Sequence, residues 1–247
     1  MSHWVGGIHA VQALLEHQPD AVSEVVIQAG RKDRRLQPII DRARNRSINS
    51  RELTRRDMDA LEPGLRHQGV MARVEGQEQV TEADLERVVA ASDRPLVLVL
   101  DGVTDPHNLG ACLRTADAVG VDLVIAPRDR AVGLTPVVRK VACGAAETVP
   151  FVAVTNLART LDRLREMGLW VVGAAGETDA DIYQAGMDRP LVLVMGAEGA
   201  GLRRLTRERC DELVRIPMAG TVESLNVSVA TGVCLYEAVR QRGAGRS

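Results

Sequence analysis

Aromatic residues, lysines and long apolar runs are scarce in this chain of 247 residues. Only five side chains are aromatic, too few for the stacking surfaces on which RRM and single-strand-binding proteins hold bases. No apolar run approaches the roughly 18 residues of a membrane span. The N-terminus also lacks the basic-then-apolar pattern of a signal peptide. These absences predict a soluble, cytoplasmic protein.

The cysteine and histidine patterns argue against a metal site. The four cysteines form no CxxC pair, which favours reduced thiols over a zinc site or a disulfide framework. His107 follows a proline, and no second histidine lies at ligand spacing from it. We therefore expect no metal ion.

Charge is distributed unevenly along the chain. The formal net charge is −2, which by itself does not indicate a polyanionic partner, and lysine occurs only at Lys32 and Lys140. Residues 30–56 nevertheless carry ten basic residues against three acidic ones. This arginine-rich segment is either a solvated helical face or a surface for RNA phosphates. Its candidate RNA-binding residues are Arg31, Lys32, Arg34, Arg35, Arg42, Arg44 and Arg46.

Residues 1–75 predict a small α/β domain. Apolar residues at helical spacing predict helices within 8–15 and 36–43, and residues 22–27 and 67–74 predict strands. Residues 76–93 carry one basic residue against five acidic ones and are weakly helical. They predict a linker packed loosely on the second domain.

Residues 94–247 predict a doubly wound α/β domain with a mostly parallel sheet. Short apolar runs alternate with helical patterns, as they do in repeated βαβ units. The predicted strands are residues 96–100, 122–126, 148–152, 169–173, 191–195 and 213–216. In such a sheet, ligands bind at the carboxyl ends of the strands.

The last predicted helix, residues 224–238, is rich in small residues and carries Gly232 in its interior. Glycine there costs about 1 kcal/mol relative to alanine, so close packing against another backbone must offset it. We expect this helix to be buried nearly all round, at a subunit contact, with Ser224 as its cap.

Three polar segments follow predicted strands: residues 101–117, 195–202 and 216–228. Taken singly, each segment also has a simple structural explanation. Asn108 fits a helix cap, Arg114 can pair with Asp117, and Glu198 fits a solvated loop. The glycines near Glu198 do not match GxGxxG, so they indicate a nucleotide loop only weakly.

Taken together, the three segments resemble the three motifs of the SpoU (TrmH-type) RNA 2′-O-ribose methyltransferases. The matches are Asn108-x-Gly-x-x-x-Arg114, then Met-Gly-x-Glu198-x-x-Gly-Leu, then Ile-Pro-Met-x-Gly-x-x-x-Ser224-Leu-Asn226. Further stretches, including His67-Gln-Gly, are similar to the branch that methylates a guanosine of bacterial 23S rRNA. The resemblance implies a deep trefoil knot in the C-terminal domain, a ribosomal-protein-like RNA-binding domain at the N-terminus, and a homodimer formed through the knotted domains.

The resemblance also assigns roles to residues. It implies S-adenosylmethionine as the cofactor, with S-adenosylhomocysteine as its product, and 23S rRNA as the partner, without a membrane or a metal. The implied catalytic residues are Arg114, Asn108, Glu198, Ser224 and Asn226. The implied cofactor-binding residues are Met195, Gly196, Gly201, Ile216, Pro217, Met218 and Leu225.

Three other functions remain open on the sequence. A non-catalytic rRNA-binding or assembly protein would keep the basic unit without needing three intact motifs. A related 2′-O-methyltransferase could act on tRNA instead. A dinucleotide-dependent oxidoreductase would need GxGxxG after an early strand, and residues 100–104 do not supply it.

Overall fold

A computed structural model of the chain describes residues 2–31, 33–75 and 80–244. The chain forms two compact units, one of Met1–Gln79 with Cys143–Thr148 and one of Val80–Ala142 with Val149–Ser247. Lys32, a predicted RNA-binding residue, lies outside the described residues. No described helix has the length and apolar character needed to span a membrane.

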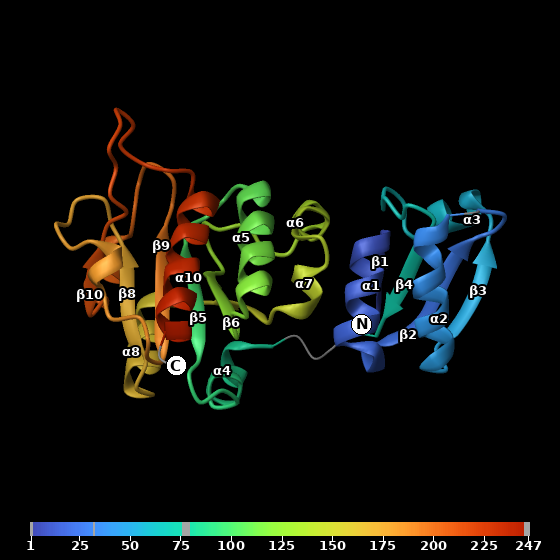
Figure 1. Cartoon of the computed structure of the whole chain (residues 1–247), viewed down its shortest axis with the longest axis horizontal. Coiled ribbons are helices and arrows are strands. Elements are labelled where there is room, and N and C mark those ends of the chain that lie inside the picture. Colours follow the sequence, from blue (N-terminus) through green and yellow to red (C-terminus); the bar gives the residue numbers. More distant parts are fainter. Residues whose placement is uncertain (1, 32, 76–79, 245–247) are drawn as a thin grey trace. The chain divides into compact units, whose positions relative to one another are not determined.

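The N-terminal unit is an α/β fold around a four-stranded mixed sheet in the order β1-β4-β2-β3. Its core lies between the sheet and α1 and α2, and Met58 of α3 is buried with strand residues Val26 and Met71 (Figure 1). The elements are β1 (His3–Gly6), α1 (Ile8–His17), η1 (Pro19–Ala21), β2 (Val22–Gln28), η2 (Arg34–Leu36), α2 (Gln37–Asn45), β3 (Asn49–Leu53), α3 (Arg55–Leu61) and β4 (Val70–Val74).

The C-terminal unit is built on a six-stranded sheet in the order β10-β8-β9-β5-β6-β7, in which every pairing is parallel. Its strands are β5 (Leu96–Asp101), β6 (Leu123–Pro127), β7 (Phe151–Val154), β8 (Trp170–Ala174), β9 (Leu191–Gly196) and β10 (Glu212–Val214). Its other elements are η3 (Glu82–Asp84), α4 (Leu85–Val89), α5 (Pro106–Val119), α6 (Pro136–Ala142), α8 (Leu157–Glu166), η4 (Ile182–Gln184), α9 (Arg204–Arg207) and α10 (Val227–Ala244). The short helix α7 (Ala145–Thr148) groups with the N-terminal unit.

Helices cover both faces of this sheet, which is why its central strands are apolar throughout. All six residues of β5 are buried. On one face, Leu161 and Leu164 of α8 pack with Val97 and Val99. Helices α5 and α10 pack against each other on the other side (Figure 1). This arrangement leaves the carboxyl ends of the strands, and the loops that follow them, at one edge.

The six strands predicted in the second domain are all present, with their ends shifted by up to three residues. The N-terminal strands β1 and β3 and helix α3 were not predicted, and β3 in particular is an exposed edge strand without an apolar pattern. The predicted linker also packs more firmly than expected at its end. Leu85 and Val89 of α4 are buried in the same core cluster as α8.

The last helix differs from the prediction in its start and its burial. It begins at Val227 rather than Ser224, and Val229 and Tyr236 are more than half exposed. A Cβ placed on Gly232 would meet only the Thr115 methyl group, at 3.9 Å. The expectation that Gly232 packs closely is therefore not met within a single chain.

Candidate functional site

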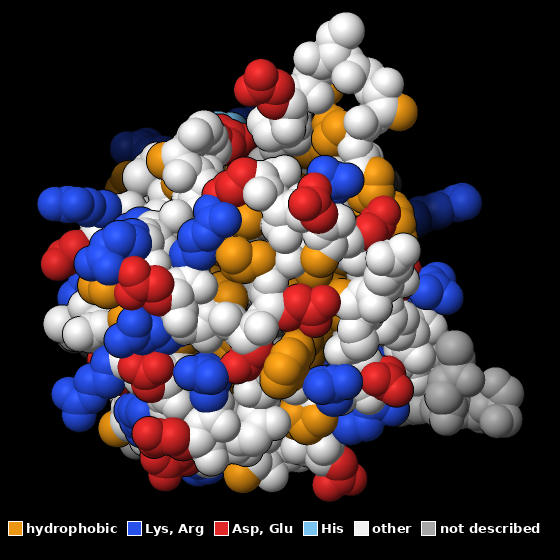
Figure 2. Space-filling model, turned by 90° about the vertical axis from the view of Figure 1, so that its left-hand side faces the viewer, with side chains coloured by type: hydrophobic (Ala, Val, Ile, Leu, Met, Phe, Trp, Pro, Cys, Tyr) orange, Lys and Arg blue, Asp and Glu red, His pale blue; other side chains and the backbone are white. Residues whose placement is uncertain are grey.

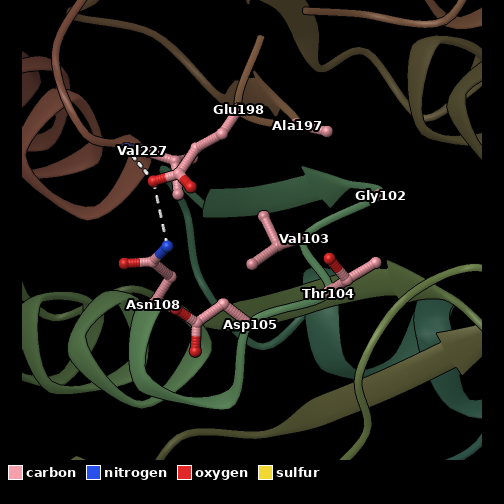
Figure 3. Close-up of a pocket in the computed structure, with 8 residues that line it drawn as sticks. All are labelled: Gly102, Val103, Thr104, Asp105, Asn108, Ala197, Glu198 and Val227. Atoms are coloured by element: carbon pink, nitrogen blue, oxygen red, sulfur yellow. Dashed lines mark hydrogen bonds between the residues drawn. The ribbon is translucent and has the colours of Figure 1, made fainter. Parts of the chain in front are cut away.

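A pocket of about 220 Å³ lies where the loops after β5 and β9 meet the start of α10 (Figure 3). Residues from all three polar segments of the sequence line it. They are Gly102, Val103, Thr104, Asp105, Asn108, Ala197, Glu198 and Val227. The three segments that follow predicted strands therefore come together at one pocket.

Asn108, Glu198 and Asn226, one from each segment, form a closed hydrogen-bonded triangle. Asn108 Nδ2 donates to Glu198 Oε1 at 3.0 Å, and Asn226 Nδ2 donates to the same oxygen at 2.6 Å. Asn226 Nδ2 also donates to Asn108 Oδ1, at 3.0 Å. In Figure 3 the side chains of Asn108 and Glu198 point toward one another across the pocket. A carboxylate that accepts from both amides fixes the orientation of each, since an ionised carboxylate can only accept.

Local backbone geometry presents Asn108 to the pocket. Asp105, not Asn108, caps α5, because its side chain accepts the His107 amide at 2.8 Å, and Pro106 occupies the first helical position. The explanation of Asn108 as a helix cap is therefore wrong. Asn108 is 8% exposed, so its amide depends on the two partners from the other segments.

Asn226 is placed in a similar way, immediately before α10. Its Oδ1 accepts the Ser228 amide at 2.9 Å and the Ser228 hydroxyl at 2.6 Å. Asn226 therefore caps the last helix, and the prediction that Ser224 would cap it is wrong. Because capping occupies Oδ1, the Nδ2 group of Asn226 is left to face Glu198.

A tight turn carries Glu198. Ala197 and Gly201 exchange two backbone hydrogen bonds, at 3.1 and 3.0 Å, which close a loop of three residues. A Cβ on Gly196 would overlap the carbonyl group of Gly201. Only glycine allows this approach, so the glycines of this segment serve the turn itself.

The loop between β10 and α10, residues 216–225, has backbone groups and apolar side chains that a ligand could contact. Within the described chain, none of its backbone amides donates a hydrogen bond to another protein group. Met218 is 37% exposed and Val222 62% exposed. In Figure 1 the loop stands above the carboxyl edge of the sheet. Free backbone groups beside apolar side chains suit an adenine.

The residues expected to hold a cofactor differ in how they can do so. Met195 is 2% exposed, so its side chain lies in the core rather than in an open site. Gly196 and Gly201 have only backbone groups to offer, and the amide and carbonyl of Gly201 already bond to Ala197. Ile216 and Leu225 are half-buried, and Pro217 is exposed beside Met218. The groups that these residues offer are thus backbone groups and apolar side chains, which fits S-adenosylmethionine as the resemblance implies.

Arg114 and Ser224 belong to the same two segments as Asn108 and Asn226. Arg114 is exposed on α5, six residues after Asn108, which places it about 120° around the helix from Asn108. Neither residue is among those that line the pocket. The pocket instead uses Gly102 to Asp105, which were not predicted individually although they follow β5 directly.

Burial disfavours the thiolate form of Cys112, which lies on the same helix as Asn108. The Cys112 Sγ lies 3.6 Å from the Thr231 hydroxyl, between α5 and α10, and burial raises the pKa of this thiol to about 11. Reactive cysteines have lowered pKa values instead. The described residues contain no cluster of three His, Cys, Asp or Glu side chains able to hold a metal.

The arginine-rich segment of the N-terminal unit is partly neutralised by its own acids. Asp33 contacts Arg35 and Arg31, which hold the pKa of its carboxyl well below the usual range. Arg42 pairs with Glu16. Four further arginines of the segment are exposed, and no ion pair is seen for them among the described residues: Arg34, Arg44, Arg46 and Arg56. The cationic character of the segment therefore concentrates on these four.

A different distribution is seen over β8 and β10 of the C-terminal unit. Figure 2 shows basic and acidic side chains interleaved there. Arg165 pairs with Asp211 at 2.8 Å and Arg209 with Asp162 at 3.4 Å. This face is not a continuous basic surface.

Comparison with known proteins identifies both units. The model of the SpoU rRNA Methylase family matches residues 95–236, and the model for RNA 2′-O ribose methyltransferase substrate binding matches residues 4–80. The chain is 57% identical over 242 residues to the 23S rRNA (guanosine-2′-O-)-methyltransferase RlmB of Escherichia coli K12, covering 98% of this chain and 100% of that protein. It is 59% identical over 237 residues to the protein of the same name from Pseudomonas putida, covering 96% and 95%.

Solved structures of SpoU methyltransferases also match the chain, over nearly all of it or over about two thirds. The SpoU methyltransferase AviRb from Streptomyces viridochromogenes, in complex with AdoMet, matches with a TM-score of 0.77 and 27% identity, covering 99% of this chain and 92% of that chain. The A. aeolicus TrmH/SpoU tRNA modifying enzyme matches with a TM-score of 0.56 and 31% identity, covering 66% and 85%.

The Gly196 turn generates a prediction. Replacing Gly196 with alanine should weaken S-adenosylmethionine binding by at least about tenfold, because overpacking typically costs about 1–3 kcal/mol and here opens the turn. Isothermal titration calorimetry measures this directly. Gly133→Ala is the control, since a Cβ there meets nothing within 4 Å. Unchanged affinity in Gly196→Ala would remove this turn from the cofactor site.

Proposed function

The chain belongs to the SpoU rRNA methylase family, and we propose that it methylates the ribose 2′-hydroxyl of a guanosine in bacterial 23S rRNA, in the peptidyl-transferase region. It is an S-adenosylmethionine-dependent RNA 2′-O-ribose methyltransferase. The observation that carries this function is the triangle of Asn108, Glu198 and Asn226, which joins the three family motifs at one pocket. A non-catalytic rRNA-binding protein has no need of that arrangement.

A tRNA substrate fits the comparisons less well. The tRNA modifying enzyme matches only 66% of this chain. The relatives named for 23S rRNA match 96% to 98% of it, including the N-terminal unit. That unit also matches the substrate-binding model. Recognition by a separate N-terminal domain therefore favours rRNA.

The chemistry requires a weak nucleophile to be oriented and deprotonated. When bound, S-adenosylmethionine supplies an electrophilic methyl group on its sulfonium sulfur. Glu198 keeps the amides of Asn108 and Asn226 in fixed orientations toward the target nucleotide, and Ser224 contributes its hydroxyl from the exposed loop before α10. The residues that hold the cofactor are the backbone of Met195, Gly196 and Gly201 and the loop that contains Ile216, Pro217, Met218 and Leu225.

Arg114 contacts the target ribose or its phosphate and stabilises the alkoxide that develops as the 2′-hydroxyl gives up its proton to water. The ordinary pKa of arginine, above about 12, makes a guanidinium a poor proton acceptor near neutral pH. Charge stabilisation by a guanidinium needs no such deprotonation. The exposed position of Arg114 on α5 leaves it accessible to RNA.

Substrate binding is divided between the units. We assign residues 1–75 to RNA binding, 76–93 to a linker and 94–247 to catalysis. With five aromatic residues in the whole chain, recognition proceeds through phosphates and RNA shape. The exposed arginines of the arginine-rich segment are supplemented by Lys32, Arg31, Arg35 and Arg42.

Two further features complete the proposal. The C-terminal chain passes through a trefoil knot, and two knotted domains form a homodimer in the cytoplasm. Support for the dimer comes from α10, where Val229 and Tyr236 are exposed on the helix that carries Gly232, a glycine whose Cβ position meets only the Thr115 methyl group, at 3.9 Å. A second helix backbone packed there would offset the cost of a mid-helix glycine.

The Arg114 assignment is tested by Arg114→Ala. We expect S-adenosylmethionine binding to stay within about twofold of wild type while methyl transfer falls at least about a hundredfold, as for loss of an interaction made in the transition state. Calorimetry and transfer of labelled methyl to rRNA measure the two quantities. Full activity in Arg114→Ala would contradict the assignment.

Neutralising the arginine-rich segment tests its role in RNA binding. Glutamine is substituted at Arg34, Arg44, Arg46 and Arg56. RNA affinity should fall, and the salt dependence of binding should flatten by about 0.7 in log–log slope for each single-strand phosphate that is no longer neutralised. Filter binding across a salt series gives both values.

A matched variant removes the same charge from the C-terminal unit, at Arg159, Arg163, Arg165 and Arg209. Ion pairs near the surface contribute about 0–1 kcal/mol each, and circular dichroism checks that this variant is folded. We expect its salt slope to equal that of wild type. Equal salt slopes in both variants would mean that the arginine-rich segment is a solvated helical face and not a surface for RNA phosphates.

A further inference from the structure

Asp101 is a fully buried carboxylate directly below the pocket. It is the last residue of β5, its side chain is 0% exposed, and the next four residues line the pocket. Burial of a carboxylate is costly unless charge and hydrogen bonds compensate it. The compensation comes from Arg203, which follows the turn that carries Glu198.

Arg203 contacts both oxygens of this carboxylate. Its backbone amide donates to Asp101 Oδ2 at 3.0 Å, and its guanidinium Nε lies 2.7 Å from Oδ1. The second contact is electrostatic rather than a directed hydrogen bond, since Oδ1 receives no hydrogen bond in the described chain. The ion contact with Arg203 is thus what balances the charge on Oδ1.

Asp101 also holds the other end of the same turn. Its backbone pairs in register with Gly196 across the β5–β9 ladder. The turn from Ala197 to Leu202 is therefore anchored to Asp101 at both ends, through Gly196 before it and Arg203 after it. Glu198 lies exposed within this turn, so its position above the sheet follows from where the turn is anchored.

We propose that Asp101 and Arg203 are positioning residues for methyl transfer: their ion contact fixes the turn that aims Glu198 at Asn108 and Asn226. This inference rests on the proposed function and deepens it, because it assigns a role to two residues outside the motif residues of the site. Both act through Glu198 rather than on the substrate.

The chain contains a matched pair that is built the same way and lies away from the pocket. Asp211 accepts the Val171 amide at 2.9 Å and pairs with Arg165, whose Nε donates to it at 2.9 Å. The side chain of Asp211 is 11% exposed. Asp211→Asn therefore imposes the same chemical change, on a similar carboxylate, without touching the Glu198 turn.

The test is Asp101→Asn in the full chain. The amide has the shape of the carboxylate but must turn an NH₂ group toward one of the two Arg203 donors. We expect kcat for labelled methyl transfer to fall at least about tenfold, because the neutral amide loses the ion contact with the Arg203 guanidinium, with KM for rRNA within about twofold. Asp211→Asn should keep the wild-type kcat.

A double-mutant cycle with Glu198→Gln separates positioning from simple stabilisation. If Asp101 acts through Glu198, adding Asp101→Asn to Glu198→Gln lowers kcat no further. Effects that multiply, or a kcat for Asp101→Asn within about twofold of wild type, would overturn the proposal. Should Asp101→Asn not fold, Arg203→Gln takes its place, with Arg203→Lys expected to recover activity and a failure to recover counting against the proposal.

Failure of this inference is distinguishable from failure of the proposed function. A wild-type chain that transfers no methyl group to rRNA contradicts the proposed function. An active wild type with an equally active Asp101→Asn variant contradicts only the role of Asp101 and Arg203.

Discussion

The three-way contact between Glu198, Asn108 and Asn226 is the interaction on which the site depends. Asn108 comes from the first turn of α5 and the other two residues come from loops, with sequence separations of up to 118 positions, and each segment is held by its own local interaction. Asp105 caps α5, the Ala197–Gly201 pair closes the turn, and Asn226 caps α10. The parallel sheet brings these devices to one edge because its strands all run the same way.

Much of the catalytic unit could be predicted from the sequence. The buried strands are continuous apolar runs, and the glycines that close the turn are visible as a pattern. The predictions were wrong where one local signal had two interpretations. Ser224 and Asn226 are both good helix caps, and only the contact with Glu198 decides between them. Asn108 likewise fits a cap until Asp105, three residues earlier, is seen to fill that role.

Other features could not be predicted because they depend on tertiary contacts or carry no pattern. Strand β3 is polar and exposed, so its apolar signal is absent, and it forms only because β2 offers a parallel partner. Gly232 predicted close packing, which a single chain does not provide. Acidic partners also reduce the number of arginines available to phosphate, at Arg31, Arg35 and Arg42. The near-neutral net charge thus averages over unlike surfaces.

The most direct test of the account is the position of the transferred methyl group. Purified protein is incubated with unmethylated 23S rRNA and methyl-labelled S-adenosylmethionine, and the modified residue is mapped by the resistance of its 3′ phosphodiester to alkali. The account predicts label on the 2′-oxygen of one guanosine. Label on a base, label only on tRNA, or no transfer would contradict it.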